Sequence, residues 1–238
     1  MIFHELEHWI HVPWVIQASL IAAALLLLAG VLIRRRLAAS GGGVLPDEGV
    51  TLRNLLEVLV EWLAGMARDR MGPDWRKYFP LVGTMFFFIL ISNLMGLVPG
   101  LGGATSDANT TWAWAIMAWV FYTGVGIAKH KRKYLVKFMG PSFFEKHMFG
   151  RTVHFRLLIP IFMPLELVLD AARMLTLAVR LLANMFADHT VIAVWLSLVP
   201  VVVPALFMGL GLVVSFLQAF VFALLTMIYI GLALEEPH

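Results

Sequence analysis

Apolar residues fall into five long runs along this chain, separated by short polar segments. The runs cover residues 14–33, 79–98, 111–128, 157–198 and 201–234. Runs of this kind approach or exceed the ~18 apolar residues that mark a membrane-spanning helix. The pattern predicts an all-α polytopic membrane protein with about five membrane-embedded helices, forming a single membrane domain over residues 1–238. A transmembrane barrel would show short alternating segments, which the sequence lacks.

Residues 50–70, between the first two runs, show a different periodicity. Leucines recur at helical spacing on one side, against Arg53, Glu57, Glu61 and Arg68. A one-sided apolar stripe predicts an amphipathic helix. Because no segment is long and polar enough for a soluble domain, we expect this helix to lie along the cytoplasmic membrane interface. The alternative is a linker helix packed on another domain.

The distribution of positive charges indicates which loops lie on the cytoplasmic side of the membrane. Lys and Arg total 18, and none lies in residues 1–33, 99–128 or 181–238. The positive-inside rule places the N-terminus outside, with residues 1–13 as an external segment, and the C-terminus in the cytoplasm. The formal net charge of +3 then reflects loops close to anionic lipid and indicates no nucleic-acid partner.

The sequence offers no bond-breaking chemistry of its own. It has no cysteine, no nucleophile elbow and no phosphate-binding loop, so we predict a chain that is not an enzyme by itself and holds no cofactor. His4, His8 and His11 could share a helix face that would suit a metal. Beside Trp9 and Trp14 they fit an interfacial anchor better, and we predict no metal site.

One face of the run 157–198 carries most of its strongly polar side chains. At about 100° per residue, six positions fit within an arc of roughly 80°. From first to last they rise about 33 Å, comparable with a hydrocarbon core of about 30 Å, so the helix either crosses the membrane fully or lies strongly tilted. The six are Glu166, Asp170, Arg173, Arg180, Asn184 and Asp188.

Arg180 is the member of this face that most needs a partner. No acidic residue lies three or four positions away on the helix, and Asp188 is about 12 Å distant along the axis. A central arginine costs roughly 2.5 to 3.5 kcal/mol on translocon scales, so it indicates a functional site with a partner or a water path. Asp170 and Arg173, by contrast, are three apart and can pair as a structural contact.

The last run carries a facing stripe. Gly211, Ser215, Gln218 and Tyr229 fall in a narrow sector, and Gln218 is the only amide between residues 201 and 234. We expect Gln218 to meet the polar face of the preceding helix. A membrane glutamine is equally suited to an interhelical hydrogen bond and to the lining of a channel.

Two segments of these last runs resemble subunit a of the F-type ATP synthase, the membrane stator subunit beside the rotating ring of c subunits. They are Arg180-Leu-Leu-Ala-Asn184-Met and Gln218-Ala-Phe-Val-Phe-Ala-Leu-Leu-Thr-Met-Ile-Tyr229. The resemblance extends to Glu166, to Ser106-Asp107-Ala-Asn109-Thr-Thr and to Glu235-Glu236. It implies that Arg180 faces the ring carboxylates, with Asn184 and Gln218 lining the region beside it.

The resemblance also implies two half-channels. It places Glu166 in the cytoplasmic half-channel, to which we assign its neighbours Asp170 and Arg173. It places His189 in the external half-channel, with Asp107 near its mouth. To the external half-channel we further assign Asp188, Ser215 and Tyr229.

Two positions depart from the family pattern. Family members commonly have Gly where this chain has Asp188, and many have His or Glu where it has Gly211. We therefore predict that Asp188, beside His189, supplies the external carboxylate that Gly211 cannot.

The implied function is that of an ion-conducting stator. Two offset half-channels, separated by Arg180, load and unload protons on the c-ring carboxylates and couple proton flow to ATP synthesis. The implied partners are the c-subunit ring, the peripheral-stalk b subunits, other ATP synthase subunits and membrane lipid. The implied location is a bacterial inner membrane.

Two other functions fit the composition. A self-contained proton or cation transporter or channel would show internal repeats and broken helices in corresponding halves, which the sequence lacks. An assembly scaffold whose polar face only docks partner helices would tolerate Arg180→Lys.

Overall fold

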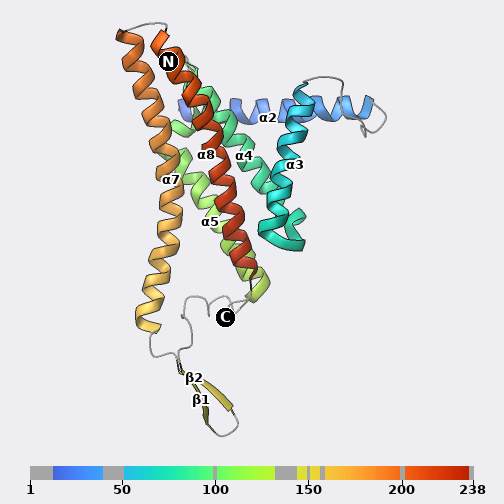
Figure 1. Cartoon of the computed structure of the whole chain (residues 1–238), viewed down its shortest axis with the longest axis vertical. Helices are drawn as coiled ribbons and strands as arrows, with labels where there is room; N and C mark the ends of the chain where they lie inside the picture. The colour runs from blue at the N-terminus through green and yellow to red at the C-terminus, as the bar shows by residue number, and fades with distance from the viewer. Residues whose placement is uncertain are drawn as a thin grey trace.

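The computed structural model describes residues 13–39, 51–98, 101–131, 144–148, 151–155, 159–198 and 202–235. Long helices dominate this part of the chain, and they confirm the predicted all-α fold (Figure 1). They are α2 (Trp14–Ala39), α3 (Leu52–Met71), α4 (Trp75–Leu97), α5 (Ala108–His130), α7 (Ile159–Leu198) and α8 (Val202–Leu234). Single 3-10 turns, η1 (Gly72–Asp74) and η2 (Ala104–Ser106), lie between α3 and α4 and before α5.

A short β-hairpin is the one element of another kind among the described residues. Strands β1 (Phe144–Met148) and β2 (Arg151–Phe155) pair antiparallel, with Phe144 opposite Phe155. The sequence analysis did not predict it. Five-residue strands that mix charged and apolar positions show no clean period of two, so the hydrophobic pattern could not reveal them.

Four stretches of the described chain are long and apolar enough to cross a membrane. They are Trp14–Arg35, Arg53–Leu97, Ala108–His130 and Val202–Leu234, of which the second joins α3 and α4. Helix α7, with its charged face, is not among them. The multi-pass character is therefore established, and the total of five membrane-embedded helices stays a prediction.

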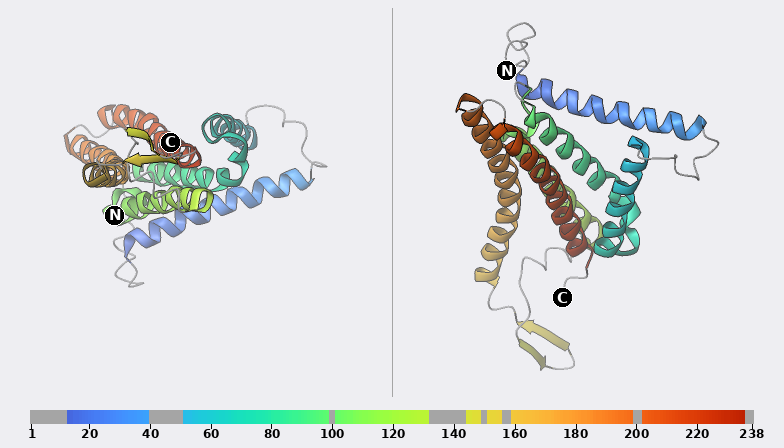
Figure 2. Two further views of the ribbon diagram at one scale, coloured as in Figure 1. Left: turned by 90° about the horizontal axis from the view of Figure 1, so that it is seen from below. Right: turned by 45° about the horizontal axis from the view of Figure 1, so that its top comes forward.

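Helix α2 runs crosswise to the other long helices (Figures 1 and 2). With 40 residues, α7 is about 60 Å long, twice the hydrocarbon thickness of about 30 Å. Helices that run crosswise to each other cannot all follow the membrane normal. The strong tilt that we expect for α7 and α8 stays a prediction.

The core of the bundle lies where α4 and α8 pack together. Phe86 and Ile89 of α4 and Phe222 of α8 are buried there, against further apolar side chains of α3, α5 and α7. A smaller cluster joins α2 to α4, where Ala18 and Ala22 contact the side of α4. The outward faces of α2, α7 and α8 expose many large apolar residues, which a lipid or a partner helix can cover.

Helix α3 begins at an N-cap, where the Thr51 hydroxyl accepts a hydrogen bond from the Asn54 backbone N–H. It packs on α4 and α8, and its Trp62 ring lies 4.8 Å from the Phe220 ring of α8. Placement of α3 at the membrane interface stays a prediction.

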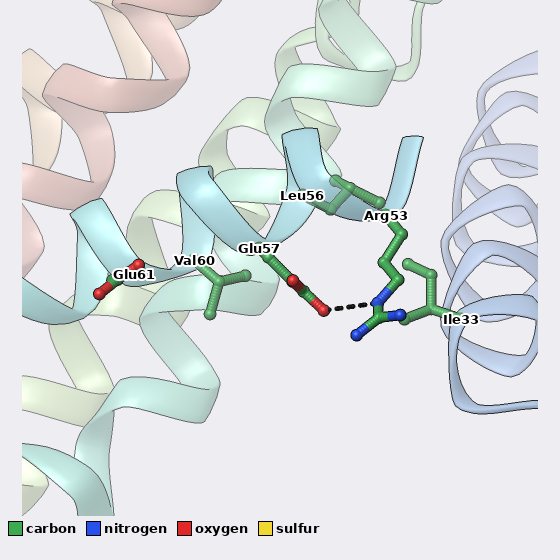
Figure 3. Close-up of a pocket in the computed structure, with 6 residues that line it drawn as sticks. All are labelled: Ile33, Arg53, Leu56, Glu57, Val60 and Glu61. Atoms are coloured by element: carbon green, nitrogen blue, oxygen red, sulfur yellow. Dashed lines mark hydrogen bonds and ion pairs between the residues drawn. The ribbon is translucent and has the colours of Figure 1, made fainter. Parts of the chain in front are cut away.

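The first turns of α3 differ from the predicted amphipathic pattern. Arg53, expected on the polar side, is 2% exposed, and Leu55, expected on the apolar side, is 54% exposed. Arg53 lies against the end of α2 beside Ile33, and its Nε donates to the Glu57 carboxylate at 2.8 Å (Figure 3). These groups line a shallow groove of about 420 Å³ between α2 and α3. The pattern failed at Arg53 because this side chain meets Ile33 of α2, a neighbour that a lone helix does not have.

Gly231 permits the close approach of α8 to the end of α3. A Cβ atom at this position would overlap the backbone carbonyl oxygen of Arg70, which cannot rotate away. We therefore expect Gly231→Ala to lower the free energy of unfolding by about 1–3 kcal/mol. Thermal denaturation of the protein, purified in detergent, measures the effect.

Gly209→Ala is the matched control for that change. Gly209 lies on the same helix, and no atom would come within 4 Å of its added Cβ. Alanine favours a helix over glycine by about 1 kcal/mol, so this variant should denature at or above the temperature of the unmodified protein. Equal behaviour of the two variants would contradict the close approach at Gly231.

Candidate ion path between the last two helices

Asn184 of α7 and Gln218 of α8 meet at the middle of the α7 and α8 pair. The Asn184 Nδ2 donates to the Gln218 Oε1 at 2.8 Å, and Gln218 is buried. The contact that we expected between the polar face of α7 and the amide of α8 is therefore present. It orients both amides and ties the two helices together at this level.

Arg180 lies one turn before Asn184 and is half-buried. Within the described part of the chain, Arg180 makes no hydrogen bond or ion pair, so no acid of those segments neutralises it there. The α7 surface next to it carries small exposed residues, Thr176, Ala183 and Ala187. Small side chains allow another helix to approach closely in a membrane. An unpaired guanidinium beside such a surface is accessible to a partner chain.

Asp188 and Gly211 lie opposite each other on α7 and α8. A Cβ atom built on Gly211 would lie 3.7 Å from the Asp188 Oδ2. The Asp188 carboxylate therefore stands beside the place that a side chain at position 211 would enter. This is the geometry expected if one carboxylate on α7 substitutes for a group missing from α8.

His189 contacts α4 rather than α8. Its Nε2 lies 2.8 Å from the Gly96 carbonyl oxygen, and a Cβ on Gly96 would crowd both His189 and Met185. A carbonyl oxygen only accepts, so this contact requires a proton on Nε2. The Nδ1 atom is then the ring nitrogen left to exchange a proton.

A polar group that the sequence analysis missed lies on α4 and η2. The Thr105 hydroxyl donates to Asn93 Oδ1 at 2.7 Å, and Asn93 Nδ2 donates to the Ser215 carbonyl at 3.3 Å. The hydroxyl oxygens of Ser92 and Ser215 are buried and find no partner among the described residues. The adjacent polar pair Ser92-Asn93 inside the apolar run 79–98 was the signal that could have revealed this group.

At the other end of α7, Asp170 is bound to helix α5. Its Oδ2 accepts from the Trp119 Nε1 at 2.8 Å, and its Oδ1 accepts from the Tyr122 hydroxyl at 3.1 Å. Arg173 donates to the same Oδ1 at 3.3 Å. The pairing of Asp170 with Arg173 that the spacing allowed is thus present, within a larger cluster.

Tyr229 requires a correction. We grouped it with the external half-channel, but its ring lies 5.5 Å from the Arg173 guanidinium and 5.5 Å from the Tyr122 ring. Because α7 and α8 are antiparallel, a residue late in α8 meets the start of α7. The structure therefore brings Tyr229 together with Arg173, a group that we assigned to the cytoplasmic half-channel, and the half-channels themselves stay a prediction.

Asp107 and Glu166 lie away from the centre of the path. Asp107 accepts from the Asn109 backbone N–H at 2.7 Å and caps α5. No contact joins Asp107 to Asp188 or His189 within the segments described. Glu166 is half-buried near the start of α7, one turn before Asp170.

Comparison with known proteins identifies the family that this sequence resembles. The family described as ATP synthase A chain matches residues 16–231. ATP synthase subunit a 2 of Syntrophotalea carbinolica is 40% identical over 187 residues, 79% of this chain and 74% of the relative. ATP synthase subunit a of Bdellovibrio bacteriovorus is 37% identical over 195 residues, 82% and 80% of the two chains. The subunit a of Geobacter sulfurreducens is 38% identical over 187 residues, 79% and 76%.

This chain belongs to the ATP synthase subunit a family. The predicted resemblance is confirmed. Together with its apolar helices, membership in the subunit a family makes the chain a multi-pass membrane protein of proton transport and ATP synthesis. The polar groups from Asn93 to Tyr229 all lie inside the matched range of the subunit a family.

Proposed function

We propose that this chain is the ion-conducting stator of a rotary F-type ATP synthase, with Arg180 separating two offset half-channels. The observation that carries the proposal is the unpaired Arg180 beside the Asn184 and Gln218 contact. A buried cation is costly unless an opposite charge or water meets it. A carboxylate on the rotating c ring is the counter-charge that fits.

The external half-channel is built around Asp188 and His189. Asp188 provides a carboxylate at the level of Gly211, and His189 provides a ring nitrogen one residue further along. Ser215 and Asn93 line the approach towards Gln218 with neutral polar groups. Asp107 stands near the mouth. Protons that enter from outside pass along these polar groups to the carboxylates of the c ring.

The cytoplasmic half-channel begins at Glu166. Glu166 and Asp188 are separated by about 33 Å along α7, with Arg180 between them. A ring carboxylate must be neutral while it faces lipid and can be ionised beside a guanidinium. Because arginine keeps its proton even when buried, protons cannot cross directly from one carboxylate to the other, and the ring must turn.

A self-contained transporter or channel is the second candidate. Such a protein needs a complete path with its counter-charges inside one chain. The lack of any acid paired with Arg180 in the described segments disfavours it. On the stator proposal this chain has no catalytic residue of its own and requires the c ring, the peripheral-stalk b subunits and the other synthase subunits. The proposed location is the bacterial inner membrane, with the N-terminus outside and the C-terminus in the cytoplasm.

Disulfide cross-linking tests contact with the ring, because the chain contains no cysteine that would interfere. We expect Ala183→Cys, on the exposed α7 surface beside Arg180, to cross-link with a cysteine placed next to the ring carboxylate on the outer c-subunit helix. On a non-reducing gel, more than half of the molecules of this chain should migrate at the size of a conjugate with subunit c.

The matched control for the cross-link is Val120→Cys. Val120 is exposed on α5, a different helix from the one that carries Arg180. It should give no conjugate under the same oxidation. Cross-linking from Val120 but not from Ala183 would place the ring on the wrong side of the bundle and contradict the proposal.

A further inference from the structure

The Asp170 carboxylate, on the polar face of α7, is buried and accepts three hydrogen bonds. Asp170 is 4% exposed, and three donors reach its carboxylate: two from α5 and one from its own helix. Trp119 and Tyr122 donate from successive turns of α5, so they fix the direction of the carboxylate as well as its depth. A group fixed on two sides in this way is suited to hold another side chain in place.

Arg173 is the side chain that Asp170 holds. Its guanidinium lies 3.3 Å from Asp170 Oδ1 and 5.5 Å from the centre of the Tyr229 ring. Asp170 on one side and the face of the Tyr229 ring on the other leave this guanidinium little freedom to turn towards Arg180 or towards the c-subunit ring. Its positive charge is cancelled locally by Asp170.

The chemistry of Asp170 argues against a role as a proton carrier. A carrier must gain and lose a proton without disturbing its surroundings. Protonation of Asp170 would weaken three hydrogen bonds at once and would leave Arg173 as a partly buried charge without its counter-ion. Asp170 was assigned to the cytoplasmic half-channel as a neighbour of Glu166, but its contacts favour the structural pairing with Arg173.

We propose that Asp170 is a positioning residue, which pins Arg173 against Tyr229 and cancels its charge at the cytoplasmic end of the α7 polar face. This rests on the proposed stator function and deepens it. Proton release to the cytoplasmic side then passes Glu166 alone, next to a neutral pair. Without Asp170, a second free cation would stand between Glu166 and Arg180 and would repel protons on their way out.

Neutralising the two residues separately and together tests this proposal. In inverted membrane vesicles, Asp170→Asn and Arg173→Gln should each lower ATP-driven proton pumping per assembled complex at least fivefold. Each leaves one uncompensated charge in the path. The double variant Asp170→Asn/Arg173→Gln should recover to within twofold of the unmodified rate, because it restores neutrality with side chains of similar size. A double variant no better than Asp170→Asn would overturn the proposal.

The α5 donors provide a second readout that does not depend on charge removal. Trp119→Phe and Tyr122→Phe keep the aromatic packing and each remove one donor to Asp170. Each should lower pumping two- to threefold, and neither should have any effect in the neutral double variant, where the carboxylate is absent. Equal losses in both backgrounds would mean that these residues only join α5 to α7, and would also overturn the proposal.

The same vesicles distinguish failure of the stator proposal from failure of the proposal for Asp170. Normal pumping by Arg180→Ala would remove the proposed function, whatever the Asp170 variants do. Impaired pumping by Arg180→Ala, with near-normal pumping by both Asp170→Asn and Arg173→Gln, would leave the stator function intact and remove only the role of Asp170.

Discussion

ATP-driven proton pumping should fall about a hundredfold in inverted membrane vesicles whose synthase carries Arg180→Ala, and passive proton leak through the membrane sector should rise. Two unit charges about 4 Å apart repel each other by roughly 4 kcal/mol at an effective dielectric constant of about 20, so the Arg180 charge opposes a proton that passes beside it. At about 1.4 kcal/mol for each factor of ten, loss of that repulsion raises proton leak by roughly two to three orders of magnitude, and pumping falls because protons return without turning the c ring.

Two further variants separate the barrier from a packing role. Arg180→Lys keeps a charge but loses the planar guanidinium, and a lysine can release its proton on burial, so pumping should stay at least tenfold low. Arg35→Ala removes an arginine from the exposed end of α2 and should pump normally. Near-normal pumping by Arg180→Lys would instead support an assembly scaffold, and normal pumping by Arg180→Ala would end the stator proposal for this chain.

The sequence allowed the helices to be predicted because each long run has the apolar length of a membrane segment. The predicted start at residue 14 and the observed start of α2 coincide, and α8 begins one residue after the predicted position. Contacts within the polar stripe were also predictable, since Gln218 was the only amide that could meet Asn184. Helical periodicity predicts a contact between two helices well when one helix face carries a single polar side chain that could make it.

Contacts made by aromatic residues of another helix were not predictable. Trp119 and Tyr122 read as ordinary members of an apolar run, and only the packing of α5 on α7 brings their donors to Asp170. The contact of Tyr229 with Arg173 was not predicted, because the angular position of Tyr229 on α8 was known but its depth relative to α7 was not. A helical wheel gives direction around an axis and says nothing about the partner that a polar aromatic group meets.

Asp188→Ala should lower pumping at least tenfold, because Gly211 offers no second carboxylate at that level. Alanine keeps the helix intact, so the loss reports the missing carboxylate. Asp188→Asn, which keeps the shape and loses the charge, should be equally low. Pumping is measured per assembled complex in inverted vesicles, together with the amount of the chain in the complex. Normal pumping by Asp188→Asn, with His189→Ala or Gln218→Leu impaired, would show that Asp188 is not the external carboxylate.

Moving the carboxylate to the facing helix should restore function. A side chain at position 211 enters the space beside Asp188, since its Cβ would lie 3.7 Å from the Asp188 Oδ2. The same Cβ would come within 2.5 Å of the Leu97 Cδ2, so the end of the flexible Leu97 side chain must turn aside. Gly211→Glu alone places two carboxylates together, which repel each other and should lower pumping. Asp188→Ala/Gly211→Glu puts one carboxylate back at the same level, from α8 instead of α7, and should recover at least a third of the unmodified rate. Recovery in the double variant, with loss in both single variants, would mean that the external half-channel requires one carboxylate at this depth and is indifferent to the helix that supplies it. A double variant as impaired as Asp188→Ala would mean that the attachment of Asp188 to α7, next to His189, is itself required, provided that Gly211→Ala, whose Cβ meets Leu97 in the same way, pumps normally.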